Sequence, residues 1–382
     1  MQYRRFGQTG FDVSALGFGL MRLPRLSDDP ADLDERESIR LVHEAVDSGV
    51  NYLDTAYGYH GEASERLAAK ALKGGYREKV RLATKLPSFK VETEDDFERF
   101  LNEQLEKLET EYIDVYLLHA LTSERWDNVY KLGVTEFLDR ALADGRILHA
   151  GFSFHDELDV FKEIVDSHKW AMCLIQLNIM DHDYQAGVEG LRYAANQGLG
   201  CAIMEPLRGG KLAENVPDEI REVWARSGQN RSPAEWALRW VLNFPEVSVV
   251  LSGMGTRDHL RENMRVAAET EPNSMTESEL QLVEEVRQIY RDRIRVACTD
   301  CGYCVPCSEG VDIPRIFRLY NEGAMYNSWE VSRRFYSRLL EDDKGPLSCT
   351  ECRNCEEACP QGIPIAKTLK EAHRHLSGQE DS

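Results

Sequence analysis

Eight of the ten cysteines in this chain lie in two closely spaced runs between positions 298 and 359. The second run has three cysteines each two residues apart, then a three-residue gap, a fourth cysteine and a proline. This is the spacing of bacterial ferredoxins, in which three cysteines bind one cubane cluster and the fourth typically binds another. Zinc also takes cysteine pairs, but its sites usually combine two separated pairs rather than a run of four. The pattern therefore favours iron–sulfur clusters over zinc.

Two [4Fe–4S] clusters need eight thiolates, which is the number that the two runs supply. Both runs lead into similar segments, GVDIP at 310–314 and GIPI at 362–365, which suggests two half-sites related by duplication. The spacer at 315–345 is predicted to form two helices, as in an all-helical ferredoxin-type module. We expect one cluster to be bound by Cys298, Cys301, Cys304 and Cys359, and the other by Cys307, Cys349, Cys352 and Cys355.

Another set of reactive residue types follows apolar runs in the first half of the chain. Asp54, Lys85, His119 and Ser153 each end such a run, and Tyr59 comes five residues after Asp54. Taken singly, a strand-end aspartate is often a helix cap and a strand-end histidine is often a core residue. Taken together, they suit the reduction of a carbonyl group.

The chemistry depends on tyrosine, whose phenol has an ordinary pKa of about 10. A neighbouring lysine cation stabilises the phenolate and lowers that pKa, and an aspartate can hold the lysine in place. A histidine can orient the substrate carbonyl. Tyr59 would then be the general acid that protonates the alkoxide as hydride arrives.

Such residues meet only if parallel strands end at one edge of a sheet. Short runs rich in Val, Ile and Leu alternate with amphipathic helical stretches, as expected for strands buried on both faces. This rhythm predicts an α/β protein with a closed (β/α)8 TIM barrel. An open doubly wound sheet is the alternative, weakened by the absence of a GxGxxG loop. The predicted strands are Ala15–Met21, Val50–Asp54, Val80–Lys85, Ile113–His119, Ile147–Ser153, Cys173–Gln176, Gly200–Met204 and Val247–Leu251.

Smaller features complete the predicted organisation. Residues 3–18 are expected to form a hairpin, and Cys173 and Cys201 are interpreted as buried core thiols. We expect a barrel domain at 1–290, a mostly α-helical dicluster domain at 291–376 and a disordered tail at 377–382.

Composition narrows the classes of partner. The formal net charge is −20, and an acidic surface repels phosphate backbones, so nucleic acid is not an expected partner. No apolar stretch approaches the roughly 20 residues of a membrane helix, and the N-terminus lacks the apolar run of a signal peptide. We therefore expect a cytoplasmic protein without a membrane partner.

The segment DTAYGYHGEASERL at 54–67, with Lys85 in LATKLP and His119 in DVYLLHAL, resembles the aldo-keto reductases. The N-terminal segment YRRFGQTGFDVSALGFG, GFS at 151–153, QLN at 176–178, EPLRGG at 205–210 and HLRENM at 259–264 are also similar to that family. The resemblance covers roughly residues 1–270, and the whole chain resembles the branch with a fused ferredoxin-type domain. It implies NAD(P)H as hydride donor and a tetrad of Asp54, Tyr59, Lys85 and His119, with Tyr57 outside it.

The resemblance also implies a set of nucleotide-binding positions. Three of them differ from many family members: Phe154 follows Ser153 in place of asparagine, Met204 stands where an aromatic residue often stacks on nicotinamide, and Gly253 replaces a lysine that meets the 2′-phosphate. Arg257 could take over that phosphate, or the enzyme could prefer NADH. The implied residues are Gly19, Met21, Arg22, Ser153, Gln176, Met204, Glu205, Leu207, Gly253, Arg257, Glu262 and Asn263.

Two functions remain in competition. The leading hypothesis is an NAD(P)H-dependent oxidoreductase that reduces an aldehyde or ketone, or oxidises the alcohol. Its two [4Fe–4S] clusters would transfer electrons, with an external ferredoxin or flavoprotein as partner. The alternative is a nucleotide-binding redox sensor or electron relay whose barrel has no carbonyl reductase activity and whose clusters are structural or serve a partner.

Overall fold

The computed structural model describes residues 1–379, and the chain divides into two compact units. The first unit comprises Met1–Gly209 and Ala234–Thr276, and the second comprises Gly210–Pro233 and the chain from Glu277 onward. Of the tail expected to be disordered at 377–382, residues 380–382 lie outside the described residues. The domain boundary expected at position 290 stays a prediction.

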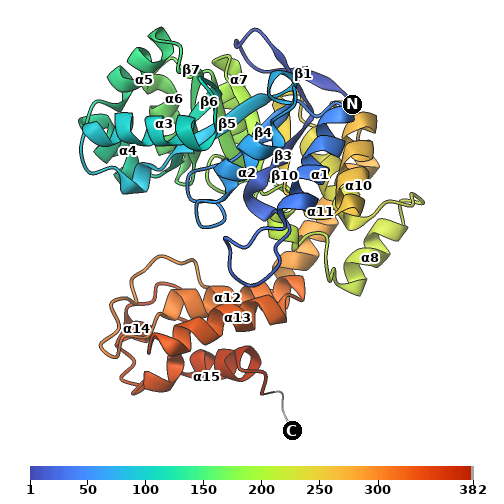
Figure 1. The fold of residues 1–382 in the computed structure, drawn as a ribbon. Helices are drawn as coiled ribbons and strands as arrows, with labels where there is room; N and C mark the ends of the chain where they lie inside the picture. Colours follow the sequence, from blue (N-terminus) through green and yellow to red (C-terminus); the bar gives the residue numbers. More distant parts are fainter. Residues whose placement is uncertain (380–382) are drawn as a thin grey trace. The chain divides into compact units, whose positions relative to one another are not determined.

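The first unit contains a closed barrel of eight parallel strands within the described residues (Figure 1). Its strand order is β10-β3-β4-β5-β6-β7-β8-β9, so the chain runs once around the barrel. The predicted (β/α)8 barrel is therefore confirmed, and the open doubly wound sheet was the wrong alternative. The strands are β3 (Leu16–Gly19), β4 (Tyr52–Asp54), β5 (Arg81–Leu86), β6 (Ile113–Leu121), β7 (Ile147–Phe154), β8 (Met172–Gln176), β9 (Gly200–Met204) and β10 (Val247–Ser252).

Apolar side chains at alternate strand positions build a core that joins most of the barrel strands. Val115 and Leu117 of β6 pack in one cluster with Met172 and Leu174 of β8, and with Val249 and Leu251 of β10. Small residues such as Ala83 and Ala202 belong to the same cluster, as expected where side chains from several strands share a closed interior. This packing holds the strand ends, and the side chains on them, in fixed register.

The N-terminal hairpin packs against the start of β9. β1 (Tyr3–Arg5) pairs antiparallel with β2 (Asp12–Ser14), so the paired part is shorter than the 3–18 expected from the sequence. The ring of Phe6 packs on Gly200, and a Cβ on Gly7 would come within 2.3 Å of the Gly200 nitrogen. Gly7 also has a positive φ of 52°, so glycine meets both a close approach and a left-handed backbone here.

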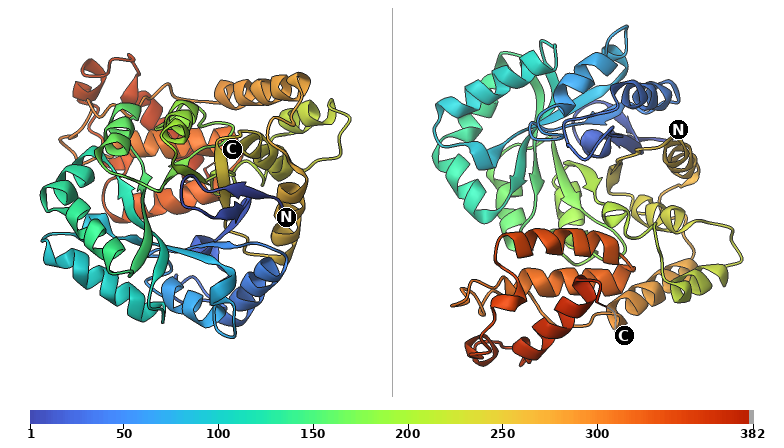
Figure 2. Two further views of the ribbon diagram at one scale, coloured as in Figure 1. Left: turned by 90° about the horizontal axis from the view of Figure 1, so that it is seen from above. Right: turned by 60° about the horizontal axis from the view of Figure 1, so that its bottom comes forward.

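Helices surround the strands of the first unit (Figure 2). α3 is representative, since Phe97, Phe100 and Leu101, which share one helical face, are buried. The helices of this unit are α1 (Glu35–Asp47), α2 (Ser64–Ala71), α3 (Asp95–Lys107), α4 (Ser123–Lys131), α5 (Val134–Ala143), α6 (Leu158–Ser167), α7 (Gly187–Asn196), α9 (Pro233–Leu242) and α10 (Arg257–Glu269), with 3-10 turns η1 (Leu20–Arg22), η2 (Arg77–Lys79), η3 (Ser88–Lys90) and η4 (Arg208–Gly210).

The second unit is helical. α12, α13 and α15 pack against one another around Phe317, Tyr336 and Leu369, and six of the eight clustered cysteines pack against this core. The two predicted spacer helices are present as α12 and α13. The helices are α8 (Asp218–Ala225), α11 (Glu277–Asp292), α12 (Ile313–Tyr326), α13 (Trp329–Glu341), α14 (Asn354–Glu357) and α15 (Ile365–Leu376), with the turn η5 (Pro346–Ser348).

Between residues 1 and 379, no helix is both long enough and apolar enough to cross a membrane.

Candidate functional site

Lys85 joins the candidate catalytic residues to one another. Its Nζ donates hydrogen bonds to Asp54 Oδ1 at 2.7 Å, to the Thr55 carbonyl oxygen at 2.6 Å and to the Tyr59 hydroxyl at 3.4 Å. Lys85 is 0% exposed and Asp54 is 3% exposed. A buried ammonium needs paired acceptors, and these three provide them. The pairing follows from topology, because β4 ends at Asp54 and the neighbouring strand β5 carries Lys85.

Burial and neighbouring charges shift the pKa values of both Lys85 and Tyr59. Burial acts to lower the pKa of Lys85, but Asp54 and Tyr59 together outweigh it and the pKa is raised, so Lys85 is a cation. Burial raises the pKa of Tyr59, and the Lys85 cation opposes that rise without cancelling it. This direction is opposite to the lowered pKa expected from the sequence. Tyr59 is therefore a protonated phenol at neutral pH, which is the form a general acid requires.

His119 lies on β6, the next strand after that of Lys85. Its ring centroid is 5.9 Å from that of Tyr59, with the rings edge-on at 78°, and 5.9 Å from that of Phe89. Burial, reinforced by Lys85, lowers the pKa of His119 to about 3. Its Nδ1 is buried without a hydrogen-bond partner in the part of the chain that the structure describes. The ring is therefore neutral at ordinary pH and can act as a hydrogen-bond donor to a ligand.

Tyr57 is turned toward other partners. Its hydroxyl donates to Glu103 Oε2 on α3 at 2.9 Å, and its ring centroid is 3.7 Å from Lys107 Nζ. Two residues of sequence separation thus place the two tyrosines in different environments.

The implied nucleotide-binding residues lie on the same ends of the strands. Gly19 ends β3, Met21 and Arg22 form η1, Ser153 is near the end of β7, and Gln176 and Met204 end β8 and β9. Glu205 and Leu207 follow β9, Gly253 follows β10, and Arg257, Glu262 and Asn263 lie on α10.

Several of these residues make direct contacts. Arg22 NH2 lies 3.6 Å from Glu205 Oε1, and a Cβ on Gly253 would come within 2.8 Å of Arg22 Cβ. Glycine at 253 is thus required by the close passage of Arg22. The structure therefore brings together the loops after β3, β9 and β10, which are distant in the sequence.

Three other residues are held by polar partners. Ser153 Oγ accepts a hydrogen bond from the Ala120 backbone nitrogen at 2.7 Å, and Asn263 Nδ2 donates to Ser252 Oγ at 2.9 Å. Arg257 Nε donates to Glu44 Oε2 on α1 at 2.7 Å, so the cation considered for a 2′-phosphate is already ion-paired.

The sequence reasoning missed Asp181, in the loop after β8. Its carboxylate accepts hydrogen bonds from Gln176 Nε2 at 2.7 Å and Asn178 Nδ2 at 2.8 Å, and it forms an ion pair with Arg208. The only local signal is Asn178, three residues earlier, whose Oδ1 accepts the Asp181 backbone nitrogen in an Asx turn. The partners from other segments were not readable from spacing.

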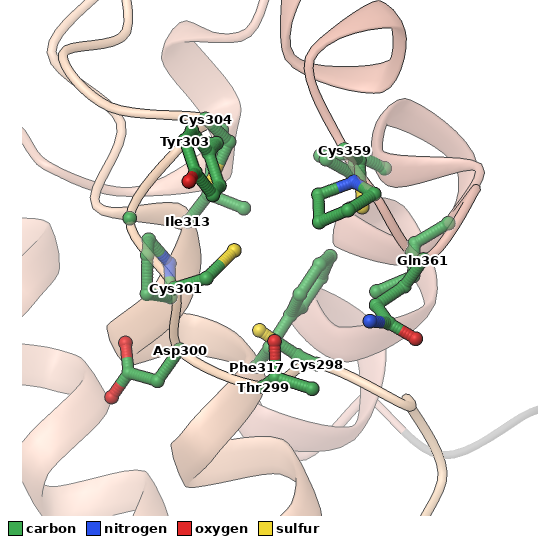
Figure 3. A pocket seen from close by; sticks show the side chains of 15 residues that line it. Cys298, Thr299, Asp300, Cys301, Tyr303, Cys304, Ile313, Phe317, Cys359 and Gln361 are labelled. Carbon is green, nitrogen blue, oxygen red and sulfur yellow. The ribbon is translucent and has the colours of Figure 1, made fainter.

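Four cysteines line a cavity in the second unit. They are Cys298, Cys301 and Cys304 of the first run and Cys359 of the second run. Figure 3 shows the side chains of Cys298, Cys301 and Cys359 around a common space, with Phe317 at its base.

The other four cysteines line a second cavity. They are Cys349, Cys352 and Cys355 of the second run and Cys307 of the first run. Ile313, the first residue of α12, lines both cavities, so the two sites are neighbours. Each cavity thus combines three cysteines of one run with the last cysteine of the other.

The donor set and surroundings of both cavities fit an iron–sulfur cluster. Burial raises the pKa of Cys304 to about 11, and it also raises the pKa of Cys298 and Cys355. Such thiols ionise at neutral pH only beside strong positive charge, which cluster iron provides. The apolar walls, including Ile313 and Phe317, limit contact with water as cluster sites require.

The profile of the aldo/keto reductase family matches residues 15–286, and that of the 4Fe-4S dicluster domain matches residues 297–365. Because the first match covers more than half of the chain, the chain belongs to the aldo/keto reductase family. It combines that oxidoreductase fold with a 4Fe–4S domain, as the branch with a fused ferredoxin-type domain does.

Curated relatives match the barrel part. A probable aldo-keto reductase 1 of Glycine max is 29% identical, over 69% of this chain and 84% of its own length. The L-galactose dehydrogenase of Arabidopsis thaliana is 26% identical, over 75% of this chain and 94% of its own. Among solved structures, the holo form of an aldo-keto reductase from Bacillus halodurans superposes with a TM-score of 0.63 at 26% identity, over 75% of this chain and 96% of that one.

Proposed function

We propose that this protein is an NAD(P)H-dependent oxidoreductase that reduces an aldehyde or ketone, or oxidises the corresponding alcohol. The observation that carries the proposal is the set of three hydrogen bonds from Lys85 Nζ to Asp54, Thr55 and Tyr59. Two relatives support the reaction class by name, the L-galactose dehydrogenase and a 6-dehydroglucose reductase of Novosphingobium aromaticivorans.

Residues of the barrel would hold the nucleotide at the strand ends. Ser153 and Gln176 would contact the carboxamide of the nicotinamide, and Met204 would contact its ring. Arg22 and Glu205 would contact the part of the nucleotide that lies between the loops after β3 and β9. Asn263 would contact the adenine side. When bound, NADPH or NADH supplies the hydride to the carbonyl carbon.

The four tetrad residues then orient the carbonyl group and supply its proton. His119, neutral because burial lowers its pKa, donates a hydrogen bond that orients the carbonyl oxygen. Tyr59 donates its hydroxyl proton to that oxygen as negative charge develops. Lys85 stabilises the phenolate left on Tyr59, and Asp54 holds Lys85 within reach. In the oxidation direction the same phenolate accepts the alcohol proton.

We also propose that the second unit binds two [4Fe–4S] clusters, with one cavity for each. Their ligands are Cys298, Cys301, Cys304 and Cys359 for the first, and Cys307, Cys349, Cys352 and Cys355 for the second. The shared lining residue Ile313 supports electron exchange between the clusters, because clusters this near to one another can pass single electrons. An external ferredoxin or flavoprotein is the proposed acceptor or donor.

The experiment for the barrel chemistry is Tyr59→Phe, with Tyr57→Phe as matched control. Turnover of a carbonyl substrate should fall about 100-fold or more in Tyr59→Phe, because a general acid contributes roughly that much. Nucleotide binding, followed by quenching of tryptophan fluorescence, should persist. Tyr57→Phe should retain turnover, since its hydroxyl bonds Glu103 instead. Full activity in Tyr59→Phe would contradict the mechanism.

A further inference from the structure

Asp181 is a buried carboxylate that the proposed chemistry does not use. It lies in the loop after β8 and is 5% exposed. Its two oxygens accept from three side chains on different segments: Gln176 at the end of β8, Asn178 in its own loop, and Arg208 in the loop after β9. A carboxylate so enclosed needs paired charge, which Arg208 supplies.

We propose that Asp181 is a positioning residue that sets the amide orientation of Gln176 for the carboxamide of bound nicotinamide, an inference that rests on the proposed function. An ionised carboxylate only accepts hydrogen bonds. The Gln176 group 2.7 Å from Asp181 Oδ2 must therefore be the amide NH2, and the amide oxygen must face away from Asp181. Gln176 thus presents an oxygen acceptor, which matches the NH2 group of a nicotinamide carboxamide.

The same carboxylate links this orientation to the loop after β9. Glu205 and Arg208 have positive φ angles of 54° and 48°, a backbone state that is costly for residues with a Cβ. Asn178 Nδ2 donates to the Glu205 carbonyl oxygen at 3.1 Å, and Arg208 is bound to Asp181. The loop that carries Glu205 is thereby tied to the residues that orient Gln176.

Asp181→Asn tests the proposal, because it keeps the shape of the side chain and adds a donor. The asparagine NH2 can bond the Gln176 oxygen, which lets the amide of Gln176 reverse. The measurement is the dissociation constant of the oxidised dinucleotide and of the matching ADP-ribose, which lacks nicotinamide, on the cluster-containing protein. The ratio of the dinucleotide constant to the ADP-ribose constant reports the nicotinamide contact alone, because partial unfolding would weaken the binding of both ligands equally.

We expect Asp181→Asn to raise that ratio about tenfold, the upper end of what one hydrogen bond between neutral amides contributes. Gln176→Ala should raise it similarly, and the double variant should show no further increase, as expected for residues acting through one contact. Asp183→Asn is the control, since Asp183 is an exposed carboxylate of the same loop that pairs with His182.

An unchanged ratio in Asp181→Asn, with dinucleotide binding intact in the natural protein, would overturn the inference alone. Additive effects of the two substitutions would also overturn it, because Asp181 would then act independently of Gln176. Equal binding of ADP-ribose and dinucleotide by the natural protein would overturn the Gln176 contact and the inference, whereas binding of neither ligand would overturn the proposed nucleotide site as well.

Discussion

Lys85 is the residue of the candidate active site on which both the fold and the proposed chemistry depend. It must stay charged at 0% exposure, and Asp54 makes this possible. The second oxygen of Asp54 is buried without a hydrogen-bond partner among the described residues, and burial raises the pKa of this carboxyl although Lys85 opposes the rise. Breaking a buried pair by removing one member typically costs about 3–5 kcal/mol. The same contact therefore stabilises the fold and, in the proposed mechanism, also assists proton transfer.

His119 gives a residue-scale prediction about acid stability. Its pKa is about 3 when folded, below the roughly 6.5 of an unfolded histidine. Its neutral form thus favours the fold above pH 6.5, and this stability is lost as the pH falls toward 3. From pH 7.5 to 5.5, the natural protein should lose about 1.4 kcal/mol more than His119→Gln.

The measurement is urea unfolding of both proteins at the two pH values, followed by circular dichroism. Equal losses in the two proteins would show that His119 is protonated in the folded state. The catalytic consequence follows from the same neutrality, because a histidine that stays neutral leaves the acid limb of the rate profile to other groups.

At the scale of elements, the loops after the strands decide what the strands can do. β8 and β9 place Gln176 and Met204, but the contacts of Asn178 and Asp181 determine how the following loops lie. α12 acts similarly in the second unit, since its first residue, Ile313, lines both cysteine cavities.

The crossing of cysteines between runs gives an element-scale prediction. Cys307→Ser and Cys349→Ser should impair one cluster, and Cys298→Ser and Cys359→Ser the other, because each pair lines one cavity. Each variant should lose about half of the iron. Members of a pair should share one electron paramagnetic resonance spectrum after dithionite reduction, and the two pairs should differ.

Cys173→Ser is the matched control, since Cys173 is buried in β8 and lines neither cavity. If Cys307→Ser instead gives the spectrum of Cys298→Ser, each run binds its own cluster and the crossed ligand sets are wrong.

At the scale of the whole molecule, one chain joins a two-electron fold with one-electron cofactors. Hydride delivers two electrons together, whereas each proposed cluster accepts one, so electrons from the nucleotide can enter the clusters only through a group that splits the pair, such as the flavin of the proposed flavoprotein partner. We expect NADPH or NADH, added anaerobically together with a catalytic amount of free flavin, to bleach the cluster absorbance and to produce a reduced-cluster resonance signal. Dithionite is the positive control. Clusters that dithionite reduces but neither nucleotide does would contradict electron transfer from the barrel and favour a structural role.

Much of the fold and of the candidate site could be predicted from the sequence because the relevant signals are local. Cysteine spacing predicted an iron–sulfur domain, since a cubane needs thiolates at short intervals. Apolar runs with helical stretches between them predicted the barrel, because parallel strands are buried on both faces. The ends of the predicted strands then identified Asp54, Lys85 and His119 as candidate catalytic residues, because residues at the C-terminal ends of parallel strands lie at one edge of the sheet.

Only the tertiary structure decided what depends on groups distant in the chain. It raised the pKa of Tyr59 where the sequence led us to expect a lowered one, because burial outweighs the lysine. It paired Arg257 with Glu44, more than 200 positions away, and gathered Gln176, Asn178 and Arg208 around Asp181. Spacing along the chain indicates which residues share an element, but desolvation and the choice of partner depend on which elements pack together in space.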